Sequence, residues 1–204
     1  MAGSPPVFDH RDPTLAGFWD ERFAQQFTPW AQSGVPPELR RFIVQTEVPL
    51  STLIPGCGVG HEVAHLAAVG WPVVAIDFSP IAVAAAQLAL GVHADRVVQA
   101  DFFAFVPSVK VQFIYERAFL CALPRVQWPE VVARWAALLP AAGLLGGFFF
   151  FDAKTSGPPF GADQDQLDLL MQPYFVLLED HPAEQSIPLF AGRERWQLWR
   201  RRED

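Results

Sequence analysis

The sequence contains little cysteine, no surplus of basic residues and no long apolar run, and each of these absences narrows the function. Its two cysteines, Cys57 and Cys121, fall in different predicted elements, so we expect no disulfide framework and a location in the reducing cytoplasm. The formal net charge of −7 argues against a nucleic-acid-binding surface, which would normally be basic. No apolar run reaches the length of a membrane span, and residues 1–13 lack the apolar core of a signal peptide. We therefore expect no nucleic-acid partner and no membrane association, and we interpret residues 1–13 as a mobile arm.

The composition that remains is that of a folded globular protein. The chain has 204 residues, of which 51% are hydrophobic, and this suits one domain with a substantial core. Helical and strand patterns alternate along the middle of the chain, which is typical of a parallel sheet with helices on both faces. The fold class that we predict is α/β, with a doubly wound, mostly parallel sheet of seven strands. The predicted helices cover residues 14–26, 36–46, 59–69, 80–90, 128–139 and 163–171, and the predicted strands cover residues 50–55, 73–76, 96–100, 111–115, 143–151, 175–179 and 196–200.

A glycine-rich turn joins the first predicted strand to the helix that follows it. Gly56, Gly58 and Gly60 have no Cβ, so the backbone there can approach a ligand closely. The free N–H groups at the start of the next helix favour an anion at this place. Asp77 follows the second strand, seventeen residues after the last glycine, where a carboxylate can accept both hydroxyls of a ribose. A dinucleotide-binding fingerprint would need glycine at His61, so the pattern resembles instead the Rossmann-like S-adenosylmethionine-dependent methyltransferases.

Polar residues follow three successive strands of the predicted sheet. Asp77, Asp101 and Arg117 come just after the second, third and fourth predicted strands. Ligands of open α/β sheets bind beyond the carboxyl ends of the strands, so we expect these three residues to share one crevice.

Four further segments make the resemblance more specific. They are Phe18–Phe23 (FWDERF), Phe27–Trp30 (FTPW), Ile114–Leu123 (IYERAFLCAL) and Gly157–Phe160 (GPPF). Together they resemble the thiopurine S-methyltransferase family, including its thiol and halide methyltransferase branch, from about residue 18 to the end of the chain. The resemblance implies a single domain, with an N-terminal helical lid over residues 14–46 and a Rossmann-like core over residues 47–204. It also implies the cofactor S-adenosylmethionine and methyl transfer to sulfur of a small molecule, a thiol or thiopurine, or to a halide.

The resemblance assigns roles to matching positions. Arg117 would lie between cofactor and acceptor, and a cation there would raise the ionised fraction of a thiol, which makes it our candidate catalytic residue. Glu116 stands before it where an aspartate is more usual. The acceptor would contact Phe27, Trp30, Arg117 and Phe160. The residues expected to hold the cofactor are Trp19, Trp30, Gly56, Cys57, Gly58, Gly60, Asp77, Phe78, Asp101, Phe102 and Arg117.

Simpler structural roles stay open for several of these residues. Trp19 and Trp30 could be core anchors. Arg117 could form only an ion pair with Glu116 or another acid. Asp101 could merely cap a turn. Cys57 is more readily explained as a small packing residue than as a nucleophile.

Other functions also stay open. The run His61–His65 matches the His-Glu-x-x-His zinc signature, but helical geometry directs the two histidines away from the sheet, and the extended signature is missing because Ala68 and Trp71 stand where it needs Gly and His. We expect no metal. An O- or N-methyltransferase acting on a small metabolite and a non-catalytic nucleoside-binding protein are the remaining alternatives. The partner we expect is a small-molecule acceptor, and we expect a monomer or weak homodimer.

Overall fold

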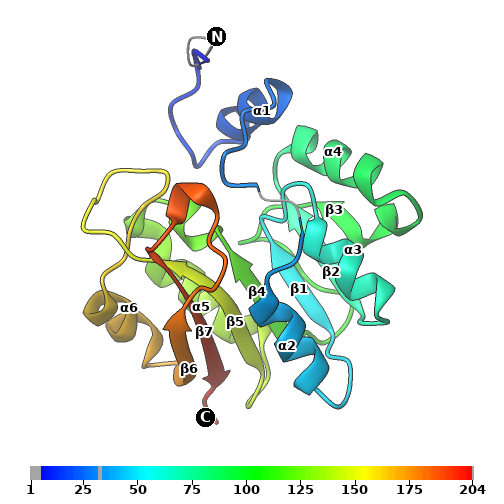
Figure 1. The fold of residues 1–204 in the computed structure, drawn as a ribbon, viewed down its shortest axis with the longest axis vertical. Coiled ribbons are helices and arrows are strands. Elements are labelled where there is room, and N and C mark those ends of the chain that lie inside the picture. Colours follow the sequence, from blue (N-terminus) through cyan, green and yellow to red (C-terminus); the bar gives the residue numbers. More distant parts are fainter. Residues whose placement is uncertain (1–5, 32–33, 204) are drawn as a thin grey trace.

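A computed structural model shows an α/β fold built on one seven-stranded sheet with helices on both of its faces (Figure 1). It describes residues 6–31 and 34–203. The predicted helices and strands are all present, most with ends shifted by one to three residues. Within the described residues, none of the helices combines the length and apolar character that crossing a membrane would need.

The sheet reverses its winding direction between two neighbouring strands. Its order is β3-β2-β1-β4-β5-β7-β6, so the chain runs outward from β1 to β3 and then returns to place β4 beside β1. Four neighbouring pairs are parallel, whereas β7 runs antiparallel to both β5 and β6. A crevice beyond the carboxyl ends of β1 and β4 is therefore expected, because this is the topological switch point. The strands are β1 (Thr52–Pro55), β2 (Val73–Asp77), β3 (Val97–Gln99), β4 (Phe113–Arg117), β5 (Leu144–Phe150), β6 (Phe175–Pro182) and β7 (Glu194–Arg201).

Side chains of alternate strand residues enter two separate cores. On β4, Phe113 and Tyr115 face the core covered by α2, α3 and α4, whereas Ile114 faces the core covered by α5 and α6. This alternation follows from the period of two along a strand. Helices cover both faces of the sheet, and for this reason the residues of its short strands are almost all apolar. The helices are α1 (Ala16–Ala24), α2 (Pro37–Gln45), α3 (His61–Ala68), α4 (Pro80–Leu90), α5 (Trp128–Leu138) and α6 (Gln164–Met171).

Local sequence signals explain where several helices begin. Ser79 caps α4 by accepting a hydrogen bond from the backbone N–H of Ala82, as its position before Pro80 predicts. Asp163 caps α6 in the same way through Gln166. Gly147 on β5 lies opposite Glu116 on β4, and a Cβ at this glycine would come within 1.8 Å of the Glu116 carbonyl oxygen. Only glycine fits at that position of the sheet.

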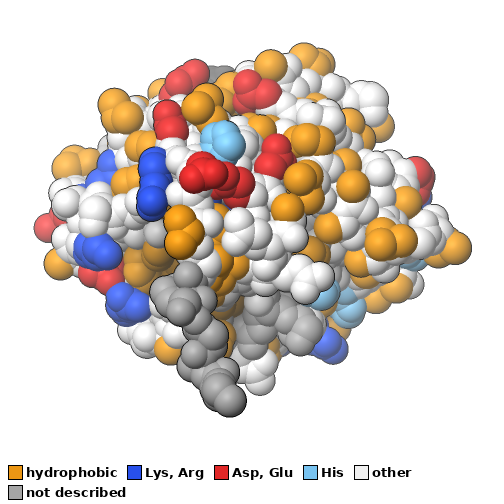
Figure 2. All heavy atoms as spheres, turned by 90° about the horizontal axis from the view of Figure 1, so that it is seen from above, with side chains coloured by type: hydrophobic (Ala, Val, Ile, Leu, Met, Phe, Trp, Pro, Cys, Tyr) orange, Lys and Arg blue, Asp and Glu red, His pale blue; other side chains and the backbone are white. Residues whose placement is uncertain are grey.

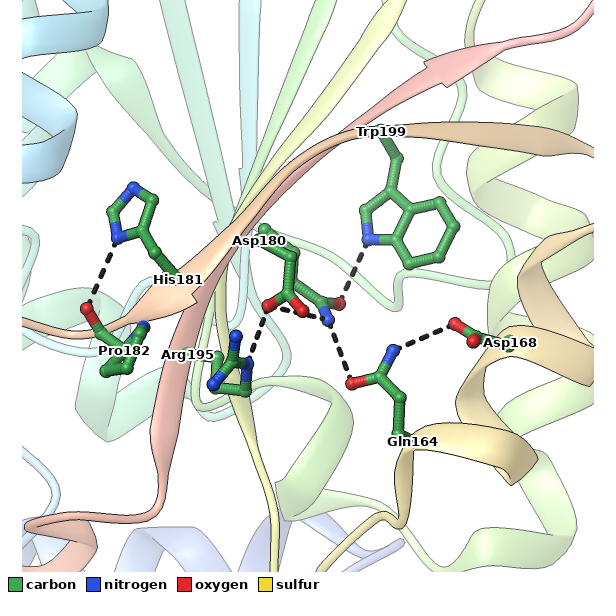
Figure 3. Close-up of polar contacts among 8 residues, drawn as sticks. Gln164, Asp168, Asp180, His181, Pro182, Arg195 and Trp199 are labelled. Atoms are coloured by element: carbon green, nitrogen blue, oxygen red, sulfur yellow. Dashed lines mark hydrogen bonds and ion pairs between the residues drawn. The ribbon is translucent and has the colours of Figure 1, made fainter.

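The strands β7 and β6 form one end of the sheet, and a buried glutamine on β7 is hydrogen-bonded to α6. Gln197 is fully buried and donates to Gln164 and Asp180, while its own oxygen accepts from the indole of Trp199 (Figure 3). Arg195 donates to Asp180 at 2.6 Å. The arginines around the last predicted strand suggest a strand with one solvated face, which the structure contradicts. Residues 196–199 are all buried, because β7 is an interior strand covered on both faces.

The N-terminal segment lies over the carboxyl ends of the strands, and α1 stands at the top of the molecule in Figure 1. Of the predicted mobile arm 1–13, residues 1–5 lie outside the described residues. Phe8 packs against Phe27, and the backbone N–H groups of Asp9 and His10 donate to Glu21. The helix α2 does not share this position. Its Phe42 packs on Phe113 of the sheet, with ring centroids 4.6 Å apart.

Candidate active site

A large cavity of about 770 Å³ opens at the switch point of the sheet. That volume is within the range of roughly 300–1,000 Å³ found for small-molecule sites. Its walls come from the ends of β1, β2 and β4, from the N-terminal segment and from the turn 157–159, whereas none of the described residues of α2 takes part. Figure 2 views the molecule from this end, where acidic, basic and hydrophobic side chains are interspersed on the surface.

The glycine turn forms the floor of the cavity beside β1. Gly56, Gly58 and Gly60 all have positive φ, at +59°, +51° and +74°, which explains glycine at each position. A Cβ at Gly56 would also come within 2.7 Å of the ring of Phe119, which follows β4. The turn therefore lets the loops after β1 and β4 meet closely across the switch point.

Asp77 is the last residue of β2 and one of the few buried acids of the protein. Its side chain is 7% exposed; Oδ2 accepts from Gly58 N at 3.1 Å, and Oδ1 accepts from Ser79 N at 3.0 Å. Burial raises the pKa of this carboxyl to about 6, against the opposing effect of the backbone donors, and neighbouring Asp20 raises it further. Each oxygen retains free lone pairs, so the group can accept two further hydrogen bonds within the cavity.

Asp101 and Phe102, which the resemblance places beside the adenine of the cofactor, occupy another wall of the cavity. Asp101 is exposed and accepts from Phe103 N at 2.9 Å, so it does cap a turn while also lining the cavity. Phe102 is buried and packs edge-on against Phe119, with centroids 4.9 Å apart. Phe78, beside Asp77, lines the cavity as well.

Aromatic side chains from α1 and the following turn cover the cavity. Trp19 and Trp30 meet edge to face with centroids 5.4 Å apart, and the Trp19 indole N–H donates to Pro13 O at 2.8 Å. Both residues line the cavity, and so does the half-exposed Phe27. The tryptophans thus act as packing anchors and as cavity wall at once.

Arg117 is the last residue of β4, where the sequence had placed it just beyond the strand. Its Nη1 forms an ion pair with Oε1 of Glu62 at 2.9 Å, and both side chains are largely buried, at 10% and 14% exposed. The guanidinium lies over the ring of Phe148, 5.2 Å from its centroid. Burial opposes the charge, but facing Tyr115 and Glu62 together hold the pKa of Arg117 above its ordinary value. Arg117 is therefore a permanent cation in the wall of the cavity.

Glu116 is not the partner of Arg117, although it precedes it in the sequence. Its side chain points to the opposite face of β4, where it is 1% exposed and accepts from the backbone N–H groups of Phe119 and Leu120. Burial raises the pKa of Glu116 to about 8, so the group is largely protonated at neutral pH. It fixes the turn after β4 that forms part of the cavity wall.

Neither cysteine has the properties of a nucleophile. Burial and the charge of Asp77 raise the pKa of Cys57 far above its ordinary range, and burial does the same for Cys121. Of the zinc signature, Glu62 is turned toward Arg117. In the part of the chain that the structure describes, no three His, Cys, Asp or Glu side chains are grouped so that they could hold a metal.

One predicted acceptor contact is not brought to the cavity. Phe160 lies behind the turn 157–159, its N–H donates to Cys121 O at 2.7 Å, and its ring packs against the core under α5. The preceding Gly157, Pro158 and Pro159 line the cavity instead. Every other predicted site residue does line it.

Among the cavity residues that were not foreseen from the sequence are Glu62, Tyr115 and Phe119, which surround Arg117 and the turn after β4. Tyr115 lies two residues before Arg117 on β4, and this spacing along a strand places both side chains on one face. Glu62 lies in the first turn of the helix after the glycine turn, where it also matches the zinc signature. A search for a partner of Arg117 at the start of that helix would have found it.

Comparison with known proteins gives one consistent family. The sequence profile of the thiopurine S-methyltransferase family matches residues 14–202. Among curated proteins, the chain is 27% identical over 198 residues to thiocyanate methyltransferase 1 of Arabidopsis thaliana, with 91% of this chain and 85% of that protein covered. It is also 27% identical over 195 residues to thiopurine S-methyltransferase of Shewanella sp. (strain ANA-3), with 81% and 89% covered.

Solved structures agree on the fold. The chain is similar to 1,6-didemethyltoxoflavin-N1-methyltransferase of Burkholderia thailandensis, solved with S-adenosylhomocysteine, with a TM-score of 0.74, 15% identity, and 98% of this chain and 95% of that chain covered. It is also similar to magnesium protoporphyrin IX methyltransferase of Synechocystis PCC 6803, solved with S-adenosylmethionine, with a TM-score of 0.70, 16% identity, and 97% and 100% covered.

Proposed function

Since this chain belongs to the thiopurine S-methyltransferase family and is an S-adenosylmethionine-dependent methyltransferase, we propose that its acceptor is the sulfur of a small thiol or thiopurine, or a halide. The observation that carries the proposal is the cavity itself. It combines the glycine turn, buried Asp77 and the cation Arg117 at the ends of three neighbouring strands.

The residues of the cavity suit the cofactor. Asp77 has two oxygens with free lone pairs for the ribose hydroxyls, and the turn at Gly56–Gly60 leaves the backbone bare for the amino-acid tail. We assign the adenine to the wall formed by Phe78, Asp101 and Phe102. Trp19 and Trp30 offer aromatic faces that suit a sulfonium.

The remaining chemistry needs little from the protein beyond position. Bound S-adenosylmethionine supplies an activated methyl group together with its leaving group. The protein must hold the acceptor in line with that group and exclude water. Arg117 favours the ionised form of a thiol, while the tryptophans and Phe27 keep the approach apolar. A soft anion of this kind needs no general base.

We further propose that α1 and the turn after it form a lid over the bound cofactor. This lid is shorter than the predicted 14–46 segment, because α2 packs on the sheet and lies apart from the cavity. Asp20 on α1 accepts a hydrogen bond of 2.5 Å from the hydroxyl of Ser79, two residues after Asp77. The contact joins the lid to the turn that we assign to the ribose.

Cofactor binding and an acceptor panel test the proposal. Calorimetry with S-adenosylmethionine should show binding to the purified protein, and assays with iodide, thiophenol, a thiopurine and a phenol should show transfer to the first three in preference to the phenol. An oxygen acceptor usually needs a base or metal at the reacting atom. Preferential methylation of the phenol would overturn the sulfur or halide assignment, and tight cofactor binding without any turnover would favour a non-catalytic role.

A location in the cytoplasm and a monomeric or weakly dimeric state complete the proposal. The first rests on the two cysteines, which are not bonded to each other. Sedimentation of the purified protein tests the second.

A further inference from the structure

Two arginines from the N-terminal segment and α1 lie in the cavity wall without an acidic partner. Arg11 and Arg22 both line the cavity. Arg11 is exposed and makes no hydrogen bond or ion pair with any residue that the structure describes. Arg22 is half-buried, and its Nη1 donates to the backbone carbonyl oxygen of Phe18 at 2.6 Å. Cations that line a cavity without neighbouring counter-charges create a positive potential there, which favours an anionic ligand.

The two guanidinium groups are close enough to repel each other. Burial lowers the pKa of Arg22, and the charge of Arg11 lowers it as well, whereas Glu21 acts in the opposite direction. Like charges that face each other are unfavourable unless an opposite charge lies beside them. The fold nevertheless brings Arg11 near Arg22, so the pair suits an anion that contacts both.

The acidic side chains nearest to the two arginines already have other partners. The carboxylate of Glu21 accepts from the backbone N–H groups of Asp9 and His10, and it forms an ion pair with Nδ1 of His10 at 2.8 Å. Oδ1 of Asp12 accepts from both the backbone N–H and the hydroxyl of Thr14. These bonds fold the N-terminal segment onto α1 and leave the arginines without an acceptor of their own.

Aromatic rings fix the guanidinium of Arg22 on the acceptor side of the cavity. The group lies over the rings of Phe18 and Phe8, 3.3 Å and 4.1 Å from their centroids. Stacking uses the faces of the planar group, so its edge keeps N–H donors that can bind a carboxylate. Phe8 in turn packs on Phe27, with centroids 5.5 Å apart, and Phe27 is one of the residues that we expect to contact the acceptor.

The other charged groups of the cavity wall have partners or assigned roles. Arg117 is paired with Glu62. We assign Asp77 and Asp101 to the ribose and adenine of the cofactor, and the free N–H groups after the glycine turn suit its carboxylate. The two arginines of the N-terminal segment and α1 therefore remain for the acceptor.

We propose that Arg11 and Arg22 form a subsite for a carboxylate that the methyl acceptor carries at a distance from its sulfur. The edge of a guanidinium matches the geometry of a carboxylate, and the charges of the two groups are opposite. This inference rests on the proposed function and deepens it, because it narrows the acceptor to thiols that bear a carboxylate.

Two thiols that differ only in a carboxylate test the subsite. Thiophenol and 4-mercaptobenzoate have the same ring and the same reacting sulfur. Calorimetry with protein saturated with S-adenosylhomocysteine measures their binding without turnover, and assays with S-adenosylmethionine measure kcat and KM. The variant Arg11→Gln removes a charge from an exposed side chain that has no bonded partner among the described residues, so the fold should be retained.

Arg200→Gln is the matched control. It makes the same change of charge at another exposed arginine. Arg200 lies opposite Leu144, the first residue of β5, and therefore at the end of the sheet away from the cavity.

We expect the wild type to bind 4-mercaptobenzoate more tightly than thiophenol. Arg11→Gln should reduce this preference by about three- to tenfold, whereas Arg11→Lys and Arg200→Gln should retain most of it. The loss should appear in the KM for 4-mercaptobenzoate and not in kcat, because the carboxylate is remote from the reacting atom. Added salt should weaken the preference in the wild type more than in Arg11→Gln.

A wild type that binds both thiols equally, or neither, would overturn the inference, as would a preference that survives in Arg11→Gln. A comparable loss of affinity for S-adenosylmethionine in Arg11→Gln would also overturn it, because the arginines would then hold the carboxylate of the cofactor. If Arg11→Gln removes the preference but no thiol is methylated by the wild type, the carboxylate subsite stands and the proposed function falls. The two failures are therefore distinguishable.

Discussion

Asp77 combines burial with unused hydrogen-bonding capacity. Its carboxylate is buried in the cavity wall, and the backbone N–H groups of Gly58, Ser79 and Phe78 compensate its charge only in part. A pKa of about 6 follows, and it makes the ionised form available near neutral pH at a cost that bound hydroxyl groups can offset.

The affinity for S-adenosylmethionine should depend on pH through this residue. Below pH 6 the free protein carries a proton on Asp77, and binding through ribose hydroxyls must displace it. The Kd should therefore rise as pH falls below about 6, by up to about tenfold per unit. Calorimetry between pH 5 and 8 measures this. Asp77→Asn should flatten the dependence, and an identical slope in wild type and variant would assign the titration to another group.

Glu62 should act through Arg117. Glu62→Ala removes the partner of Nη1 and should lower kcat/KM for a thiolate by about tenfold, whereas Glu62→Gln can still accept from Nη1 and should recover most of the activity. The Kd of the cofactor should be the same in all three proteins. If glutamine is as damaging as alanine, the charge of Glu62 matters rather than its hold on the guanidinium.

The sequence was sufficient to predict some of the site residues but not others. Asp77, Asp101 and Arg117 were predicted to share a crevice because parallel strands end at one edge, and they do. Phe160 was misplaced because the chain turns at Gly157–Pro159 and carries its ring into the core. Glu62 and Tyr115 were missed, although the strand spacing points to Tyr115, because the contact between α3 and β4 that gives Glu62 its role forms only in the fold.

Among the secondary-structure elements, α1 has the greatest expected influence on ligand exchange, because its side chains cover the cavity. It contacts the rest of the molecule near the cavity through Trp19 and through the hydrogen bond from Ser79 to Asp20. Ser79 also caps α4, so one residue joins the lid, the helix and the turn beside Asp77.

Asp20→Ala should speed release of the cofactor. The substitution removes the bond from α1 to Ser79 but leaves the cap of α4 and the bonds of Asp77 in place. We expect an off-rate about two- to tenfold higher, measured by stopped-flow tryptophan fluorescence, with unchanged hydrogen-exchange protection of α4. Asp20→Asn, which can still accept from Ser79, is the control. An unchanged off-rate in Asp20→Ala would show that α1 does not act as a lid.

The boundaries of the elements were predictable because helix starts and strand periods are local. Pro80 after Ser79 and the apolar runs of the central strands were sufficient for that. The environment of the last strand could not be predicted in this way. It depends on the pairing of β6 with β7, which buries Trp196 and Trp199 on opposite faces of the sheet. The packing of α2 on the sheet is likewise a long-range result, which the predicted 14–46 lid missed.

At the scale of the whole molecule, buried acids make the free energy of unfolding depend on pH. The pKa of Glu116 is about 8 in the folded protein, because burial disfavours its charged form. In the unfolded chain its pKa is the ordinary 4.5. The folded state thus holds a proton that the unfolded state releases above pH 4.5. The stability from this proton is fully present below that pH and is lost as pH rises through 8.

The free energy of unfolding should therefore decrease between pH 6.5 and 8, by at most about 1.4 kcal/mol per pH unit from this group. Glu116→Gln keeps an oxygen for Phe119 and Leu120 and removes the titration, so its slope should be smaller. Denaturant unfolding at several pH values measures both. Parallel slopes in the two proteins would show that Glu116 is ionised in the fold.

The most direct test of the central claim is a calorimetric titration of wild type and Asp77→Ala with S-adenosylmethionine at pH 7.5. We predict binding at one site in the wild type and a loss of roughly 1–3 kcal/mol in the variant, since two charge-assisted hydrogen bonds to the ribose disappear. Equal affinities in the two proteins, or no binding by the wild type, would contradict it.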